Sequence, residues 1–356
     1  MKEKMSTGIE GMVCPVPLPH QERIVMGHGS GGKMSHDLIR KAFMQPWENP
    51  ILGAGDDAGV VAVAGPARLA ISTDAHVVAP LFFPGGDIGK LAVCGTINDV
   101  AMMGARPLYL TASFILEEGL PLETLERVVD SMRAAAEEAG VQIIAGDTKV
   151  VGRGSADGLY ISTTGVGLIP EGLEINGACA RPGDAIIVSG TLGDHGIAVL
   201  SARGELGLET ELASDVAPLN GLIAKMLAAS AGIHVLRDPT RGGLATTLNE
   251  ISRQSGVEMV LQEEQIPVKA AVDAACELLG FDPLYIANEG KLVAIVAQDD
   301  AEKVLSAMRR HKYGAEAAII GRVSGEQPAG RVLMKTLVGS HRVVDVLMGE
   351  MLPRIC

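Results

Sequence analysis

Cysteine pairs, long apolar runs and targeting signals are all missing from this chain of 356 residues. The five cysteines, at positions 14, 94, 179, 276 and 356, are scattered, odd in number and without any C-x-x-C pair. This spacing excludes a disulfide framework, gives no indication of a zinc site and is typical of a reducing cytosol. Since no stretch of about 18 apolar residues and no cleavable N-terminal signal occurs, we expect a soluble cytoplasmic protein without membrane contact.

Positive charge is also scarce. Lys and Arg number 30 against 43 Asp and Glu, so the formal net charge is −13. Because nucleic-acid binding depends on basic side chains that neutralise phosphates, nucleic acid is not an expected partner. Nucleotides are still possible ligands, since carboxylates can recruit magnesium ions that then hold the phosphates.

Aromatic residues make up only 3% of the chain, while alanine, valine, leucine and glycine dominate. Strand-like and helix-like runs alternate, which predicts an α/β protein, and the length favours two domains. A turn at 181–184 opens a second series of elements, so we place a boundary near residue 175. The expected parts are an N-terminal arm at 1–22, a first domain at 23–175, a second domain at 176–335 and a tail at 336–356.

Acidic residues of the first domain recur at predicted strand ends or on one predicted helix. They are Asp56 and Asp57 before a strand at 60–63, Asp74 after a strand at 69–73, Asp99 on a helix at 88–103, and Asp147 after a strand at 141–145. Adjacent or buried carboxylates need either solvent or a cation. Solvated turns explain each position singly, whereas the recurrence predicts a Mg²⁺–nucleotide site.

Two glycine-rich segments and one isolated acid add weaker signals. Residues 27–33 read Gly-His-Gly-Ser-Gly-Gly-Lys, before a short helix for which Ser35 is the expected N-cap. Backbone N–H groups there can approach an anion, and Lys33 can meet a phosphate, but the spacing is not that of a P-loop. A phosphate-binding loop and a surface linker both fit. Residues 238–243 predict a helix start, either an anion-binding helix N-terminus or a purely structural one, and Glu289 is either a turn acid or a general base.

The chain ends in Cys356, which places a thiol beside the terminal carboxylate. Chain ends are usually poorly ordered unless they dock, so this cysteine can reach outward or fold back into its own protein. A frayed end and a travelling thiol both fit the sequence.

Together the motifs resemble the ATP-dependent superfamily that contains aminoimidazole ribonucleotide synthetase, selenophosphate synthetase and thiamine-monophosphate kinase. They are GSGGK at 29–33, GDDAG at 55–59, STD at 72–74, GKLAVCGTINDVAMMGARP at 89–107, GDTKV at 146–150, DPTRGG at 238–243 and NEG at 288–290. Within that superfamily, residues 71–110 and the ending Pro-Arg-Ile-Cys resemble the hydrogenase-maturation carbamoyl dehydratases, the HypE family. The resemblance covers about residues 23–356 and leaves the arm and Cys14 without a role.

This resemblance implies an α/β (α+β) fold of two mixed-sheet domains of the aminoimidazole ribonucleotide synthetase type. It implies a homodimer formed through the N-terminal strands, a mobile C-terminal tail, and ATP and Mg²⁺ bound at the dimer cleft. The implied residues are Asp57, Asp74, Asp99 and Asp147 for the metal, and Lys33, Gly31, Gly32, Thr73, Asn98 and Gly146 for ATP. The sequence leaves open which of Asp56 and Asp57 touches the metal.

The resemblance further implies that Cys356 receives a carbamoyl group from the carbamoyltransferase HypF. ATP-dependent dehydration would convert the thiocarboxamide into a thiocyanate, whose cyanide passes to the iron of a NiFe hydrogenase on the HypC–HypD scaffold. Glu289 and Lys149 are the implied proton handlers. Two rival functions are a small-molecule synthetase or kinase of the same superfamily in which Cys356 is idle, and a nucleotide-binding partner without catalysis.

Overall fold

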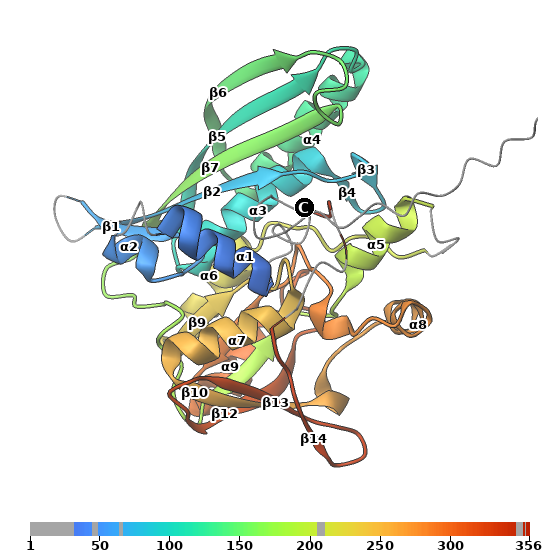
Figure 1. Cartoon of the computed structure of the whole chain (residues 1–356). Helices are drawn as coiled ribbons and strands as arrows, with labels where there is room; N and C mark the ends of the chain where they lie inside the picture. The colour runs from blue at the N-terminus through green and yellow to red at the C-terminus, as the bar shows by residue number, and fades with distance from the viewer. Residues whose placement is uncertain (1–31, 45–48, 64–66, 205–210, 347–351, 353) are drawn as a thin grey trace, which may run out of the picture.

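The computed structural model describes residues 32–44, 49–63, 67–204, 211–346, 352 and 354–356, and in it the chain forms two α/β domains (Figure 1). The first domain is built on a five-stranded mixed sheet in the order β1-β2-β7-β5-β6. Its strands are β1 (Gly59–Ala62), β2 (Arg68–His76), β5 (Arg106–Glu117), β6 (Gln142–Val151) and β7 (Leu159–Ile169). A two-stranded hairpin, a π-helical segment and four helices complete it: β3 (Phe82–Phe83), β4 (Gly86–Asp87), η2 (Ile39–Met44), α1 (Lys33–Leu38), α2 (Pro50–Gly53), α3 (Ile88–Met102) and α4 (Leu122–Ala139).

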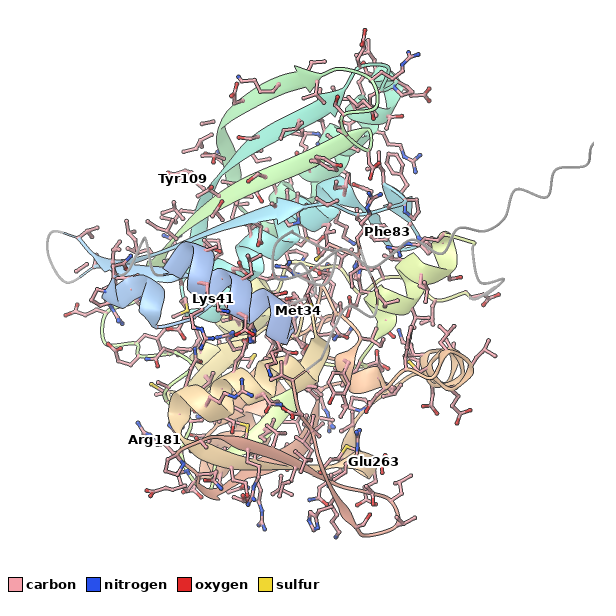
Figure 2. All side chains as sticks on the ribbon, in the orientation of Figure 1. Met34, Lys41, Phe83, Tyr109, Arg181 and Glu263 are labelled. Atoms are coloured by element: carbon pink, nitrogen blue, oxygen red, sulfur yellow. The ribbon has the colours of Figure 1, made fainter. Side chains whose placement is uncertain are left out.

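The two long helices cover one face of this sheet only. Along β2, Ser72 and His76 are buried toward α3, whereas Ile71, next to Ser72, is 39% exposed on the opposite face. This alternation is the period of two that a half-covered strand requires. Tyr109 on β5 lies on the same open face and is 45% exposed (Figure 2). The described residues therefore leave apolar side chains of β2 and β5 exposed on this face of the sheet.

The helices begin and end where the sequence signals them. Asp87 caps α3, since its Oδ1 accepts hydrogen bonds from the backbone N–H groups of Gly89 (2.8 Å) and Lys90 (3.1 Å). Gly140 ends α4 in the left-handed conformation with φ of 69°. Almost every residue of α3 is buried, so polar side chains on this helix need partners inside the protein.

The second domain carries a seven-stranded mixed sheet in the order β14-β13-β10-β12-β8-β11-β9. Its strands are β8 (Ala185–Val188), β9 (Ile233–Arg237), β10 (Val257–Gln262), β11 (Val293–Val296), β12 (Ala318–Glu326), β13 (Arg331–Lys335) and β14 (His341–Val343). Its helices are α5 (Asp194–Ala202), α6 (Asn220–Ala229), α7 (Gly243–Ser255), α8 (Ala270–Leu279) and α9 (Ala301–Arg309), with 3-10 turns at Glu263–Gln265, Pro283–Tyr285 and Gln298–Asp300. The predicted boundary near 175 falls in the connection between β7 and β8.

Three sequence expectations about local structure are wrong. Asp74 and Asp147 do not follow their strands but lie inside them, because β2 pairs with β7 through His76 and β6 pairs with β5 through Val151. Tertiary pairing thus overrides the weak strand propensity of Gly146 and Asp147. Ser35 is not an N-cap, since α1 already begins at Lys33.

The chain end contacts the body of the protein. β14 pairs with β13, and Val344 is buried, so the second sheet continues past the predicted limit at residue 335. Ile355 forms an antiparallel bridge with Val78, and the C-terminus lies between the two domains (Figure 1). The predicted arm at 1–22, with Cys14, lies outside the described residues.

Candidate active site

Two carboxylates from neighbouring elements meet at the centre of the first domain. Asp74 lies on the helix-covered face of β2, where the hydroxyl of Thr96 donates to its Oδ2 at 3.3 Å. Asp99 lies one turn further along α3 and accepts a hydrogen bond from Ser72 Oγ at 2.7 Å. Burial raises the pKa of Asp99 well above its ordinary value, and the charges of Asp74, Asp238 and Asp57 raise it further. The four carboxylates therefore lie within electrostatic range of one another.

Asp57 joins this group from the loop before β1 through a buried arginine at the end of β9. The Arg237 guanidinium contacts Asp57 Oδ1 at 2.7 Å and Glu250 Oε2 at 2.5 Å, and it donates to the backbone oxygen of Gly55. Burial raises the pKa of Asp57 more strongly than Arg237 lowers it. Among the described residues, Asp57 Oδ2 is buried without a hydrogen-bond partner, so one oxygen is left for a cation or a proton.

Asp56 behaves differently from its neighbour. Its Oδ1 accepts a hydrogen bond from the backbone N–H of Gly177 at 2.8 Å and so fixes the connection between the two domains. Because only Asp57 combines an unpartnered buried oxygen with electrostatic contact to Asp99, Asp57 is the better metal candidate of the two.

Glu289 enters the same region from the second domain. Its backbone N–H donates to Asp215 Oδ1 at 2.9 Å, and its side-chain Oε1 is buried without a partner among the described residues. Burial raises the pKa of Glu289 well above its ordinary value, the charges of Asp238, Asp215 and Asp74 raise it further, and Arg241 lowers it. A carboxyl group whose pKa is raised in this way is suited to proton transfer near neutral pH.

The terminal residue reaches this cluster. The backbone N–H of Val77 donates to the oxygen of Cys356 at 2.9 Å, three residues after Asp74. The charge of Cys356 has the largest effect on Arg241 and raises its pKa. Burial lowers this pKa, and the charges of Asp74, Glu289 and Asp99 raise it. Arg241 thus links the chain end electrostatically to carboxylates of both domains.

Several residues named from the sequence do not join the cluster within one chain. Lys149 Nζ pairs with Asp147 Oδ2 at 2.8 Å on the exposed strand β6, and this hydrogen bond is the main cause that lowers the pKa of Asp147. Two strands, β7 and β5, separate β6 from β2, so Gly146 and Asp74 stand about 14 Å apart at about 4.8 Å per strand. Thr73 faces the open side of the sheet, where its hydroxyl contacts Thr164.

Asn98 is occupied by structural contacts. Its amide N–H groups lie 3.0 Å from the oxygen of Ala217 and 3.4 Å from that of Glu289, and its Oδ1 accepts from Leu219 N–H at 2.8 Å. Asn98 therefore ties α3 to the second domain, since its amide N–H groups and its Oδ1 already have partners there.

Lys33 lines a separate cavity together with His36 and Arg253. It opens α1 and is exposed, while His36 one turn later contacts Glu250 at 3.2 Å. Since Glu250 also pairs with Arg237, three successive contacts connect α1 to Asp57: His36 to Glu250, Glu250 to Arg237, and Arg237 to Asp57. Gly32 precedes α1 and is buried, whereas Gly31 lies outside the described residues.

Sequence reasoning missed Arg237, Asp238 and Arg241, although the last two belong to a motif that it singled out as a helix start. The available signal was a carboxylate and a guanidinium together at a glycine-rich turn. Burial raises the pKa of Asp238 to about 6. No local pattern marks Arg237, whose role depends on contacts with residues distant in the sequence.

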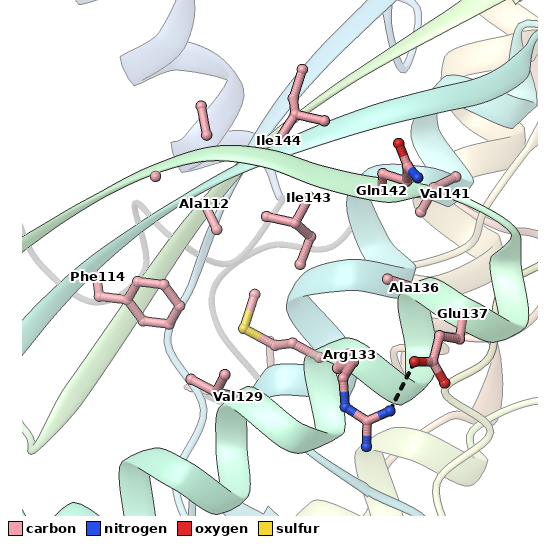
Figure 3. A pocket seen from close by; sticks show the side chains of 13 residues that line it. Ala112, Phe114, Val129, Arg133, Ala136, Glu137, Val141, Gln142, Ile143 and Ile144 are labelled. Atoms are coloured by element: carbon pink, nitrogen blue, oxygen red, sulfur yellow. Dashed lines mark hydrogen bonds and ion pairs between the residues drawn. The ribbon is translucent and has the colours of Figure 1, made fainter.

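A cavity of about 720 Å³ between β6 and α4 is not part of this site (Figure 3). Its lining is mainly apolar, with Phe114, Val129 and Ile143, and the charged pair at its edge is Arg133 with Glu137 at 2.8 Å. Its position next to the β6 edge sets it apart from Asp74 and Asp99.

The described residues of one chain do not make a complete metal site. Within the described ranges, no three His, Cys, Asp or Glu side chains are placed to hold a metal ion. Mg²⁺ usually takes only one or two carboxylates, together with water and substrate phosphates. The unpartnered oxygen of Asp57 and the mutual repulsion of Asp57, Asp74 and Asp99 therefore fit this ion when a nucleotide accompanies it.

The described part of the chain also contains no helix long and apolar enough to cross a membrane. None of the four described cysteines is in a disulfide.

Comparison with known proteins assigns the family. The models for AIR synthase related proteins match both domains, the N-terminal one at residues 55–169 and the C-terminal one at residues 181–333. The carbamoyl dehydratase HypE of Cupriavidus necator is 61% identical over 334 residues, which cover 94% of this chain and 95% of that protein.

Solved structures agree with this assignment. The HypE–HypF complex contains a chain 51% identical with a TM-score of 0.82, covering 87% of this chain and 99% of that chain. The hydrogenase maturation protein HypE in complex with ATP is 50% identical with a TM-score of 0.78, covering 94% of this chain and 100% of that chain. With this identity over nearly its whole length, the chain belongs to the HypE family of carbamoyl dehydratases within the AIR synthase related proteins.

Proposed function

We propose that this chain dehydrates a carbamoyl group carried on its own Cys356 to a thiocyanate, at the expense of ATP, and so supplies cyanide for the iron of a NiFe hydrogenase. The observation that carries this proposal is the position of the terminal residue beside Arg241, Asp74 and Glu289. The Cys356 side chain is partly buried there, against an apolar cluster to which both domains contribute. Its family membership and the ATP complex of a relative support the same chemistry.

The reaction needs two steps. The carbamoyl oxygen attacks the γ-phosphorus of ATP, which releases ADP and a proton and forms an S-bound imidate phosphate. Phosphate then leaves with its C–O bond electrons while the remaining N–H proton is removed, and the carbon–nitrogen triple bond forms. Phosphorylation is required because an amide oxygen is a poor leaving group, and catalysis consists mainly of positioning and charge stabilisation.

Residues of both domains divide this work. Glu289 would accept the N–H protons, since its Oε1 is unpartnered and its pKa is raised. Lys33 would approach the phosphates from the start of α1. Asp57, Asp74 and Asp99 would hold Mg²⁺, which when bound would neutralise charge on the transferring phosphoryl group.

We propose that a second copy of the chain completes the site. Gly146, Asp147 and Lys149 are exposed on β6, and the open sheet face beside them carries exposed Ile71, Tyr109 and Ile115. Exposed apolar surface of this kind favours burial in an interface. In a twofold dimer through the N-terminal strands, the β6 residues of one copy would meet the carboxylates of the other.

The expected partners follow from the chemistry. HypF would load the thiol, as supported by the solved HypE–HypF complex of a relative. The HypC–HypD scaffold would accept the cyanide. A reducing cytoplasm suits a reactive terminal thiol that must not be oxidised.

Substitution of the terminal cysteine tests the proposal against its main rival. Cys356→Ala in the full chain should abolish the ATP turnover that depends on carbamoyl loading by HypF, because the substrate has no attachment point. Cys179→Ala is the matched control and should turn over ATP at the wild-type rate. A small-molecule synthetase or kinase with an idle Cys356 would instead keep full turnover in the Cys356→Ala variant with a diffusible substrate.

A further inference from the structure

The last three residues lie alongside a short segment that follows β2. The backbone N–H of Val77 donates to Cys356 O at 2.9 Å, and that of Ala79 donates to Arg354 O at 3.2 Å. Val78 and Ile355 lie opposite each other in this antiparallel bridge. The chain end thus adds a minimal strand to residues 77–79, next to the carboxylate cluster.

His195 on α5 and Arg203 at the C-terminal end of this helix add polar contacts to the same segment. His195 Nε2 lies 2.6 Å from Ile355 O, and Arg203 Nη2 donates to Arg354 O at 2.8 Å. Arg203 Nε also donates to Ala79 O at 2.9 Å, so one guanidinium joins both sides of the bridge. Every acceptor in these contacts is a main-chain carbonyl.

The protonation of His195 follows from its partners. A carbonyl oxygen only accepts, so Nε2 carries the proton, and Nδ1 accepts from Ser214 Oγ at 2.8 Å. Burial is the main influence on the imidazole and lowers its pKa, which keeps this ring neutral. The donor toward Ile355 is therefore fixed by Ser214 and not by pH near neutrality.

Apolar contacts and a strained backbone conformation also hold the chain end in place. Ile355 and Leu352 are buried, and a Cβ built on Gly196 would come within 3.1 Å of Leu352 Cδ1. Arg354 adopts the left-handed conformation with φ of 53°, which a residue with a side chain keeps only when its surroundings fix it. These contacts come from both domains and hold the segment in one orientation.

We propose that His195 and Arg203 form a clasp that positions the Cys356 sulfur at the carboxylate cluster by binding the main chain of residues 354 and 355. They are positioning residues and take no part in the chemical step. Because these hydrogen bonds are made to backbone carbonyls and not to the sulfur, the clasp holds the tail equally well with a thiol, a carbamoyl or a cyano group on the sulfur. That the sulfur carries a carbamoyl or cyano group rests on the proposed function, whereas the contacts of the clasp do not.

The test is the rate at which iodoacetamide alkylates Cys356 in the full chain, located by peptide mass mapping. Arg203→Met and His195→Phe should each speed alkylation about fivefold, because each loses a hydrogen bond that holds the thiol in place. His195→Gln retains an amide donor and should stay near the wild-type rate. Arg309→Met is the matched control, since it removes a comparable contact to the carbonyl of Ala317 far from the tail.

A second readout is the rate of water loss from the HypF-carbamoylated chain with Mg–ATP. It should fall by a similar factor in Arg203→Met and His195→Phe and recover in His195→Gln, with ATP affinity unchanged. Wild-type alkylation rates in both Arg203→Met and His195→Phe, with melting temperatures that show folded proteins, would overturn the clasp. Faster alkylation with no water loss even in the wild type would support the clasp and contradict the proposed function.

Discussion

Mixing two inactive variants should restore activity if a second copy of the chain completes the site. Asp74 faces the helices from β2, whereas Asp147 pairs in register with Ser113 on the open face of β6. The two carboxylates are thus on opposite faces of one sheet and three strand spacings apart, about 14 Å. No side-chain rearrangement in one chain brings both to one phosphate.

The fraction of activity that mixing should restore follows from twofold symmetry. Asp74→Asn and Asp147→Asn should each be inactive alone. Random exchange in an equal mixture makes about half of the dimers mixed, and each mixed dimer has one site with both changes and one with neither. The mixture should therefore recover about a quarter of the wild-type rate, measured as ATP-dependent thiocyanate formation after HypF loading.

Two controls make the result decisive. Asp130→Asn changes an exposed aspartate of α4 whose side chain contacts Arg133 at 3.7 Å, and this variant should be fully active. Native mass spectrometry should confirm that mixed dimers are present. Mixed dimers without recovered activity would refute the shared site, since each chain would then have to supply every residue itself.

Three further predictions concern single residues. Arg237→Met should lower the free energy of unfolding by about 3–5 kcal/mol in urea, because it leaves the buried Asp57 and its neighbour Glu250 uncompensated. Adding Asp57→Asn should restore part of that loss. Glu289→Gln should stabilise the protein more at about pH 8 than at about pH 5, because the raised pKa of Glu289 in the folded state makes the wild type lose stability as pH rises through that pKa. The same difference in urea midpoint between variant and wild type at both pH values would contradict the shift. Asp87→Ala should lower the free energy of unfolding by about 1 kcal/mol through loss of the α3 cap, measured by the same urea titration.

Local signals predicted much of the fold. The helix predicted at 88–103 is α3 at Ile88–Met102 with Asp87 as its cap, and α4 lies between Pro121 and Gly140, residue types that commonly begin and end helices. These features depend on neighbours within one or two turns, so the sequence alone contains the cause. The family motifs extended the prediction to two mixed-sheet domains, which the comparisons confirm.

The site was predicted less completely because its contacts are long-range. The predicted acidic group was Asp56 or Asp57 with Asp74, Asp99 and Asp147. Asp57, Asp74 and Asp99 lie within electrostatic range of one another, whereas Asp147 lies apart on β6, and the expectation that Asp74 follows its strand was wrong. The face on which Thr73 lies depends on the register with β7, a relation between segments 90 residues apart.

Some residues gave no local signal at all. Arg237 matters because it bridges a loop and a helix of different domains, and His195 because it meets the chain end 160 residues later. Their side chains match no short motif, so only the folded chain identifies them.

The most direct test of the central claim is the intact mass of the chain. After carbamoyl loading by HypF, Mg–ATP should lower the mass by that of one water, with the change confined to the C-terminal peptide that contains Cys356. The loss should require ATP and be absent in Glu289→Gln. ATP hydrolysis that leaves the carbamoyl mass unchanged on the tail would contradict the account.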